Sequence, residues 1–210
     1  MKDALLLQVG IGAEFAAMLD ASHARHVAYC AAHSFDFLAI TEPVAPTPPM
    51  WQRYCCIAWA FTMGYQFVAA LDADALIADT RIDLRSASTK PLAMKWAQAP
   101  GGEPAGYNAG AIFARAASAP LFDEMTLRAP GVSVKQDGPW WLLPDGEQRI
   151  LNELLRQERW AMQTEPLGAF WNCVLGIEDV PQPAIVAWHG IEDPGERLRL
   201  MRQWLQRNSA

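Results

Sequence analysis

The first 80 residues alternate between short apolar runs and longer segments with helical periodicity. Apolar runs at residues 5–9, 35–40 and 67–71 have the length of buried strands, and the segments 13–32 and 50–65 between them carry apolar residues at helical spacing. Strands that alternate with helices form parallel sheets, because a parallel pair needs a long crossover connection. This half of the chain therefore predicts a parallel sheet with a ligand site at the carboxyl ends of its strands.

The second half is less regular. We expect strands at residues 91–96, 107–114, 160–171 and 185–188, and helices at 120–128, at 146–157 with Asp145 as N-cap, and from Pro194 to the C-terminus. The predicted fold is one α/β, Rossmann-like domain. It has a mostly parallel central sheet flanked by helices and a smaller mixed sheet.

Composition and charge exclude several classes of function. The net charge of −6 over 210 residues argues against a nucleic-acid binder, which needs a basic surface. No stretch approaches the roughly 20 apolar residues of a membrane helix, and the apolar run 4–9 is too short for the hydrophobic region of a signal peptide. The four cysteines have neither zinc-site nor CxxC spacing. These features predict a cytoplasmic protein with reduced thiols.

Two carboxylates follow the third predicted strand at once. Asp72 and Asp74 are separated only by Ala73, directly after the apolar run 67–71. Such close acids repel each other and lose solvation, which favours a hard cation such as Mg²⁺ or Mn²⁺ between them. A solvated loop is the alternative explanation, and the motif alone does not decide between the two.

Three later segments add polar groups suited to the same site. Asn108 lies in a small Asn-Ala-Gly turn ahead of an apolar strand, where backbone can approach a ligand closely. Glu147 and Gln148 begin a predicted helix. His189 ends a predicted strand, and its imidazole is a candidate third ligand for the metal.

In this order, these segments resemble the retaining A-type (GT-A) glycosyltransferases. The resemblance rests on Leu-Asp-Ala-Asp at 71–74, Asn-Ala-Gly at 108–110, Glu-Gln ahead of Ile-Leu-Asn at 147–152, and His-Gly at 189–190. One similar group contains glycogenin and bacterial lipopolysaccharide galactosyltransferases. The other contains yeast mannan galactosyltransferases and plant xyloglucan xylosyltransferases, which residues 26–36 also resemble. Glu147 stands where the first group usually has Asp. The C-terminal Lys-Pro-Trp segment of that group is missing, and Arg197 or Arg199 is a candidate for its basic contact to the diphosphate.

The resemblance implies a hexose transfer from a uridine-diphosphate sugar with Mn²⁺ or Mg²⁺, and retention of anomeric configuration. It divides the chain into a nucleotide-binding half (1–80), an acceptor half (81–193) and a C-terminal helix (194–210). Its implied metal ligands are Asp72, Asp74 and His189, its donor-binding residues Arg53, Asp72, Asp74 and Lys95, and its catalytic residues Asn108, Glu147 and Gln148. An inverting reaction needs a carboxylate base instead, for which Glu147 and Asp137 are candidates.

The loop Gly10-Ile11-Gly12 is predicted to contact the nucleobase. Phe15 stands where a dinucleotide fingerprint has its third glycine, which argues against a dehydrogenase.

The acceptor is expected to be a glycan or a lipid-linked sugar. The tryptophan pair at 140–141 is a candidate acceptor contact, with packing as the alternative. The final helix carries Arg197, Arg199, Arg202 and Arg207 around an apolar stripe, which suits either a solvated face or peripheral contact with an anionic membrane.

Other classes of function remain open. Hydrolases of the haloacid-dehalogenase type also use Asp-x-Asp after a strand, but usually near the start of the chain. A sugar-nucleotide pyrophosphorylase has a basic first loop, whereas Ala13 and Glu14 follow Gly12 here. A non-catalytic protein that only binds nucleotide sugars is the third alternative.

Overall fold

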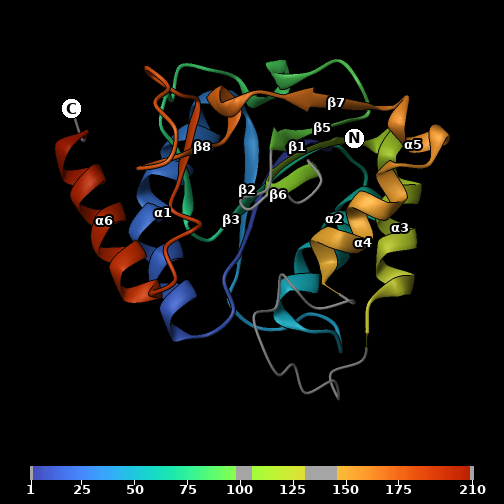
Figure 1. Ribbon diagram of the computed structural model, residues 1–210, viewed down its shortest axis with the longest axis horizontal. Coiled ribbons are helices and arrows are strands. Elements are labelled where there is room, and N and C mark those ends of the chain that lie inside the picture. Colours follow the sequence, from blue (N-terminus) through green and yellow to red (C-terminus); the bar gives the residue numbers. More distant parts are fainter. Residues whose placement is uncertain (1, 98–105, 131–145, 209–210) are drawn as a thin grey trace.

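A six-stranded mixed sheet forms the centre of the protein. The computed structural model describes residues 2–97, 106–130 and 146–208. The strand order is β2-β1-β3-β6-β5-β7, with helices on both faces (Figure 1). These strands are β1 (Lys2–Val9), β2 (Phe35–Ile40), β3 (Tyr65–Asp72), β5 (Leu92–Ala97), β6 (Gly106–Arg115) and β7 (Thr164–Leu167).

The N-terminal half has the parallel arrangement that its sequence predicts. β1 pairs in parallel with both β2 and β3, and helices α1 (Ala13–His33) and α2 (Gln52–Thr62) are the crossover connections. Leu5, Leu6 and Leu7 are at most 1% exposed, because helices cover both faces of this central strand. A strand buried on both faces needs apolar side chains on each, which explains the unbroken apolar run.

The sheet becomes antiparallel at β6. This strand runs antiparallel to both β3 and β5, whereas β5 and β7 are parallel. Helices α3 (Ala119–Arg128), α4 (Glu147–Leu155) and α5 (Glu158–Ala161) belong to this half. Three of the five pairings in the sheet are parallel, so the predicted mostly parallel α/β fold is confirmed.

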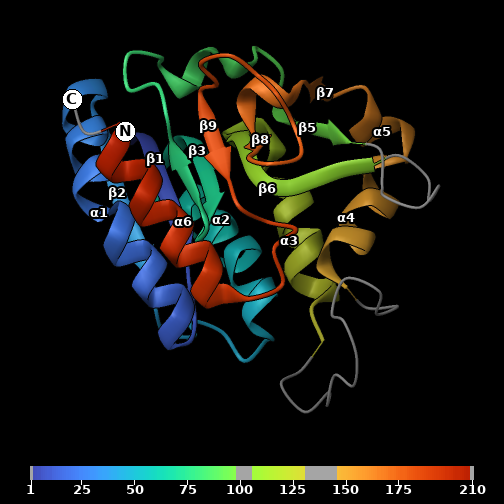
Figure 2. The same cartoon turned by 60° about the vertical axis from the view of Figure 1, so that its left-hand side comes forward.

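A second, three-stranded sheet joins distant parts of the chain. It has the order β4-β9-β8 and contains β4 (Ala75–Ile77), β8 (Cys173–Val174) and β9 (Ile185–Ala187). β9 pairs antiparallel with β4 and in parallel with β8. Because β4 begins just after Asp74 and β9 ends just before Trp188, this pairing places the two segments side by side. Helix α6 (Pro194–Arg207) follows and packs against α1 (Figure 2).

The predicted strand at 160–171 is wrong as a single element. The segment forms the end of α5, the short strand β7 and a 3-10 helix at Ala169–Trp171. Pro166 cannot donate a hydrogen bond to a neighbouring strand, which restricts β7 to the edge of the sheet. Further 3-10 helices are Pro49–Trp51, Leu84–Ala87 and Ala116–Ser118. Asp137, Trp140, Trp141 and Asp145 lie outside the described residues.

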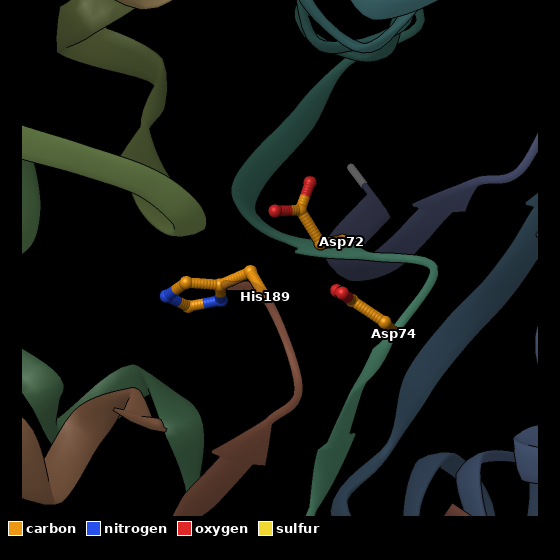
Figure 3. Close-up of side chains that lie close together, drawn as sticks. All are labelled: Asp72, Asp74 and His189. Atoms are coloured by element: carbon orange, nitrogen blue, oxygen red, sulfur yellow. The ribbon is translucent and has the colours of Figure 1, made fainter. Parts of the chain in front are cut away.

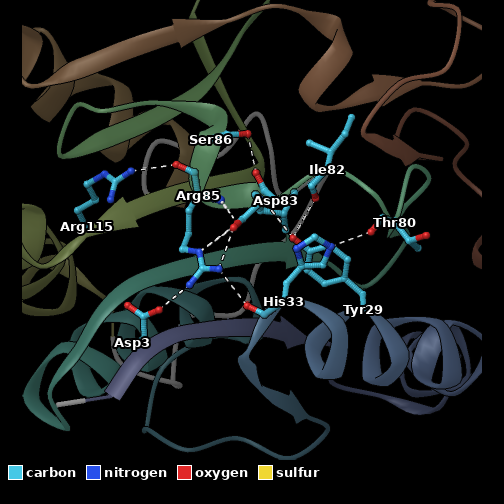
Figure 4. A network of polar contacts seen from close by, with 10 residues as sticks. Asp3, Tyr29, His33, Thr80, Ile82, Asp83, Arg85, Ser86 and Arg115 are labelled. Atoms are coloured by element: carbon cyan, nitrogen blue, oxygen red, sulfur yellow. Dashed lines mark hydrogen bonds and ion pairs between the residues drawn. The ribbon is translucent and has the colours of Figure 1, made fainter.

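A polar network centred on Arg85 fixes the connection between β4 and β5 (Figure 4). Its guanidinium forms ion pairs with Asp3 and Asp83 and donates to the carbonyl oxygen of His33 at 3.0 Å. Tyr29 on α1 adds two bonds, because its hydroxyl donates to Ile82 O at 3.2 Å and accepts from Leu84 N at 2.9 Å. The connection is thereby held against the C-terminal half of α1.

His26 on α1 is a buried neutral histidine. Its Nδ1 lies 2.8 Å from Gln8 Oε1, and its Nε2 accepts from the Ile77 amide at 3.2 Å. Burial, aided by the nearby positive charges of Arg25 and His23, lowers the pKa of His26 to about 3. The ring therefore stays neutral and links β1 to β4.

This histidine predicts a loss of stability in acid. The unfolded chain binds a proton near pH 6.5, whereas the folded chain resists it until about pH 3. Stability is thus fully present above pH 6.5 and falls by up to about 1.4 kcal/mol per unit as pH decreases toward 3. Urea unfolding between pH 7 and 4 should show a shallower pH dependence in His26→Gln. Exposed His23→Gln is the control; it removes only the smallest contribution to the His26 pKa and should stay much closer to the wild-type slope than His26→Gln does. Equal slopes in all three proteins would contradict the prediction.

Candidate functional site

The Asp-x-Asp segment forms a tight connection between the two sheets. β3 ends at Asp72, and β4 begins at Ala75. Gln8, fully buried in β1, donates through its amide to the carbonyl oxygens of Asp72 and Ala75, both at 3.0 Å. The Trp188 amide donates to Asp74 O at 3.2 Å. Hydrogen bonds from Gln8 in β1 and from Trp188, which follows β9, therefore fix the backbone of this turn.

Asp72, Asp74 and His189 come together at this turn (Figure 3). One ligand atom from each residue lies within 4.8 Å of the others, although His189 is more than 100 residues away in sequence. Two ligands opposite each other on one ion at ~2.1 Å are about 4.2 Å apart, so the spacing suits a single divalent cation after a small adjustment. Carboxylate oxygens with one imidazole also suit Mn²⁺ or Mg²⁺ chemically.

The electrostatics of the cluster favour a cation. Burial and the neighbouring Asp72 raise the pKa of Asp74 above its usual range, against the opposing effect of Arg197. Burial lowers the pKa of His189, which keeps the imidazole neutral and able to act as a ligand. Its Nδ1 is buried without a hydrogen-bond partner among the described residues. A bound cation would relieve both the repulsion between the acids and this unpaired nitrogen.

Two arginines pair with the carboxylates of the cluster. Arg53 Nη1 lies 2.7 Å from Asp72 Oδ1, and Arg197 Nη1 lies 3.0 Å from Asp74 Oδ2. Arg53 also donates to the carbonyl oxygen of Ala109 and lies 3.9 Å from Glu147. Desolvation opposes the charge on Arg53, but Asp72, Tyr54 and Glu147 outweigh it and raise its pKa. Arg53 is therefore a permanent positive charge beside the cluster.

Asparagine and glutamine side chains extend the site along β6. Asn108 Oδ1 accepts from the Gly110 amide at 2.8 Å and from Asn172 Nδ2 at 3.0 Å. Gln148, in the first turn of α4, accepts from the Ala109 amide at 3.0 Å. These bonds place Asn108 and Gln148 at the same end of β6, where Gly110 lies against Asp72.

Glu147 is buried beside this group. It is 2% exposed, and its Oε2 has no hydrogen-bond partner in the described ranges. Burial raises the pKa of Glu147, whereas the charge of Arg53 lowers it. The structure thus places all three predicted catalytic residues near the carboxylates.

Two predicted donor contacts have other roles in the structure. Lys95 is 5% exposed, and its Nζ forms an ion pair with Glu178 at 2.6 Å. Gly10 allows close packing, since a Cβ there would lie 2.8 Å from Phe15 O and 2.9 Å from Leu19 Cδ1. Packing alone explains this glycine, and contact of either residue with a ligand stays a prediction.

Sequence reasoning missed two residues that organise the site. Gln8 is the one polar side chain in the run Leu5–Val9, and that interruption is a usable signal. Of the two arginines that the sequence offers for the diphosphate, Arg197 and Arg199, the structure places Arg197 against Asp74. Asn172 is fully buried and holds Asn108, but it has no distinctive sequence context.

Several solved structures of glycosyltransferases are similar to this fold. A glycosyltransferase involved in the glycosylation of the major capsid of PBCV-1 has a TM-score of 0.70 and 17% identity, covering 96% of this chain and 99% of that one. Mouse xyloside xylosyltransferase 1 has a TM-score of 0.53 and 10% identity, covering 90% and 98%. A Drosophila β-1,4-galactosyltransferase 7 mutant, in complex with manganese, UDP-Gal and xylobiose, has a TM-score of 0.50 and 13% identity, covering 89% and 71%. Sequence comparison finds no matching protein family and no matching curated protein.

The chain has the GT-A fold. The structural similarity establishes the architecture. Because the sequence identities are only 10–17%, the activity must be argued from the site. The fold also removes the support for a hydrolase of the haloacid-dehalogenase type, which rested on the Asp-x-Asp motif alone.

Gly110 offers a test of how closely the site is packed. A Cβ at this position would lie 2.9 Å from both Asn108 Oδ1 and Asn172 Nδ2, and 3.2 Å from Asp72 Oδ2. Gly110→Ala should therefore lower the free energy of unfolding by roughly 1–3 kcal/mol and weaken Mn²⁺ binding, as measured by urea denaturation and titration calorimetry.

The matched control is Gly168→Ala. A Cβ at Gly168 meets no atom within 4 Å, so this variant should retain wild-type stability and Mn²⁺ affinity. Unchanged Mn²⁺ binding in Gly110→Ala would show that the packing of these amides against Asp72 does not matter to the metal.

Proposed function

We propose that the protein is a metal-dependent glycosyltransferase that moves a hexose from a uridine-diphosphate sugar to a glycan or lipid-linked acceptor. The observation that carries the proposal is the convergence of Asp72, Asp74 and His189 at the carboxyl end of β3, in a GT-A fold. A structural neighbour that binds manganese and UDP-Gal supports the same chemistry.

In this proposal the three residues hold Mn²⁺ or Mg²⁺. The ion supplies positive charge that stabilises the diphosphate as it leaves the sugar. Arg53 adds a second positive charge within reach of Asp72, and its buried ion pairs hold it in place. Arg197 pairs with Asp74 and offers a further positive charge near the diphosphate.

Asn108 and Gln148 are proposed to contact the donor sugar. Both belong to the amide group along β6, which is held by internal hydrogen bonds and is therefore preorganised. Gln148 is assigned the place nearest the anomeric carbon, and Glu147 is assigned an electrostatic role behind it. Retention of configuration follows from the resemblance alone, and product anomers measured by NMR would test it.

The cellular setting is part of the proposal. None of the helices in the described ranges has the length and hydrophobicity needed to cross a membrane. In α6, Arg197 and Arg199 pair with Asp74 and Glu196, which leaves Arg202 and Arg207 for any contact with anionic lipid. We propose a cytoplasmic protein whose last helix touches the membrane at most peripherally.

The donor class is tested by thermal shift with a panel of nucleotide sugars, with and without Mn²⁺. A ligand present at 100 times its dissociation constant stabilises the folded state by about 2.7 kcal/mol. We expect uridine-diphosphate sugars with Mn²⁺ to raise the melting temperature of wild type and to have little effect on Asp74→Asn. The exposed acid Asp20, changed to Asn, is the control and should behave as wild type.

Two outcomes count against the proposal. An equal shift in Asp74→Asn would place the donor elsewhere, and His189→Gln would provide the same comparison if Asp74→Asn failed to fold. Donor binding with neither transfer nor slow Mn²⁺-dependent donor hydrolysis would instead favour the non-catalytic alternative.

A further inference from the structure

A cavity of about 410 Å³ lies beside the metal cluster, between α6 and two loops that flank the small sheet. One loop follows β8 and the other follows β9. Its lining consists of Leu175, Gly176, Ile177, Trp188, His189, Gly190, Ile191, Leu200, Gln203, Trp204 and Arg207. Because His189 belongs both to the cluster and to this lining, the cavity adjoins the proposed metal site.

The walls of the cavity are apolar. Trp188 and Trp204 meet edge to face with ring centroids 6.5 Å apart, and aliphatic side chains from both loops and α6 supply most of the remaining lining. Gly190 adopts φ +100°, and a Cβ there would lie 3.3 Å from Ile177 Cδ1. The glycine lets the two loops approach each other at the edge of the cavity.

Ile177 is the most telling wall residue. It lines the cavity and yet is 73% exposed, which leaves a large apolar side chain in water. At the rim of an apolar cavity, this side chain enlarges the surface that an apolar ligand would cover. At about 30 Å³ for each water-sized group, the cavity has room for roughly a dozen non-hydrogen atoms.

We propose that this cavity binds the apolar aglycone of a glycoside acceptor. The inference rests on the proposed function and names the class of its second substrate. The donor does not match these walls, because its diphosphate and sugar are polar and its base needs hydrogen-bond partners. Among the described residues, the polar side-chain groups of the lining are those of His189, Gln203 and Arg207 and the two indole N–H groups. An alkyl or aryl group on the acceptor matches these walls and would lie next to His189, a proposed ligand of the metal that holds the donor diphosphate.

The test compares octyl β-glucoside, below its micelle concentration, with methyl β-glucoside. The sugar is identical, so any difference in affinity reports the aglycone. Each buried methylene adds about fourfold to affinity. With Mn²⁺ and UDP present, tryptophan fluorescence should show octyl β-glucoside binding at least tenfold more tightly than methyl β-glucoside.

Ile177→Asp places a charge in the wall and should reduce that preference to less than threefold. Met162→Asp is the matched control, because Met162 is also 73% exposed but lies outside the cavity lining; it should keep the preference. Three results would overturn the inference: no octyl preference in wild type, the same loss in both variants, or competition between UDP and octyl β-glucoside. Failure of the proposed function would appear separately, as the absence of a Mn²⁺-dependent thermal shift with uridine-diphosphate sugars.

Discussion

The mutual repulsion of Asp72 and Asp74 is the constraint around which this structure is built. Two carboxylates are held at the end of a strand that is buried on both faces, and because Asp74 is only 3% exposed, solvent screens their repulsion only in part. Arg53 pairs with Asp72, Arg197 pairs with Asp74, and the neutral imidazole of His189 lies nearby. Arg53 and the other two groups are far apart in the sequence, so only the complete fold brings them to the carboxylates.

The small sheet brings His189 to the two carboxylates. β4 continues directly from the Asp-x-Asp turn and pairs with β9, which brings His189 to the turn without any long loop. Beneath the turn, the buried pair of Gln8 and His26 satisfies backbone groups of Asp72, Ala75 and Ile77. A polar pair inside an apolar sheet is costly unless fully bonded, and here it fixes the backbone that carries the acids.

The sequence was most informative where the pattern was regular. Alternating strands and helices in the first 80 residues led to the correct parallel half, and Asp72 and Asp74 followed from their position after an apolar run. The contact of these acids with His189 was also foreseeable, since a strand followed by histidine suggested a third ligand. Asn172 was not foreseeable, because burial and pairing across the fold give no local periodicity, and the sequence offered Arg197 only as an alternative to Arg199. The segment 160–171 is not one strand, because Pro166 and Gly168 interrupt it.

The ion pair between Arg197 and Asp74 has a consequence for how the protein responds to metal. Any cation that takes Asp74 as a ligand must compete with a guanidinium carried by α6, so occupancy of the cluster and docking of the last helix are linked equilibria. By reciprocity, whatever weakens the hold of α6 on the body of the protein also frees a ligand for the ion. The apparent affinity for metal is therefore a property of the C-terminus as well as of the acids themselves.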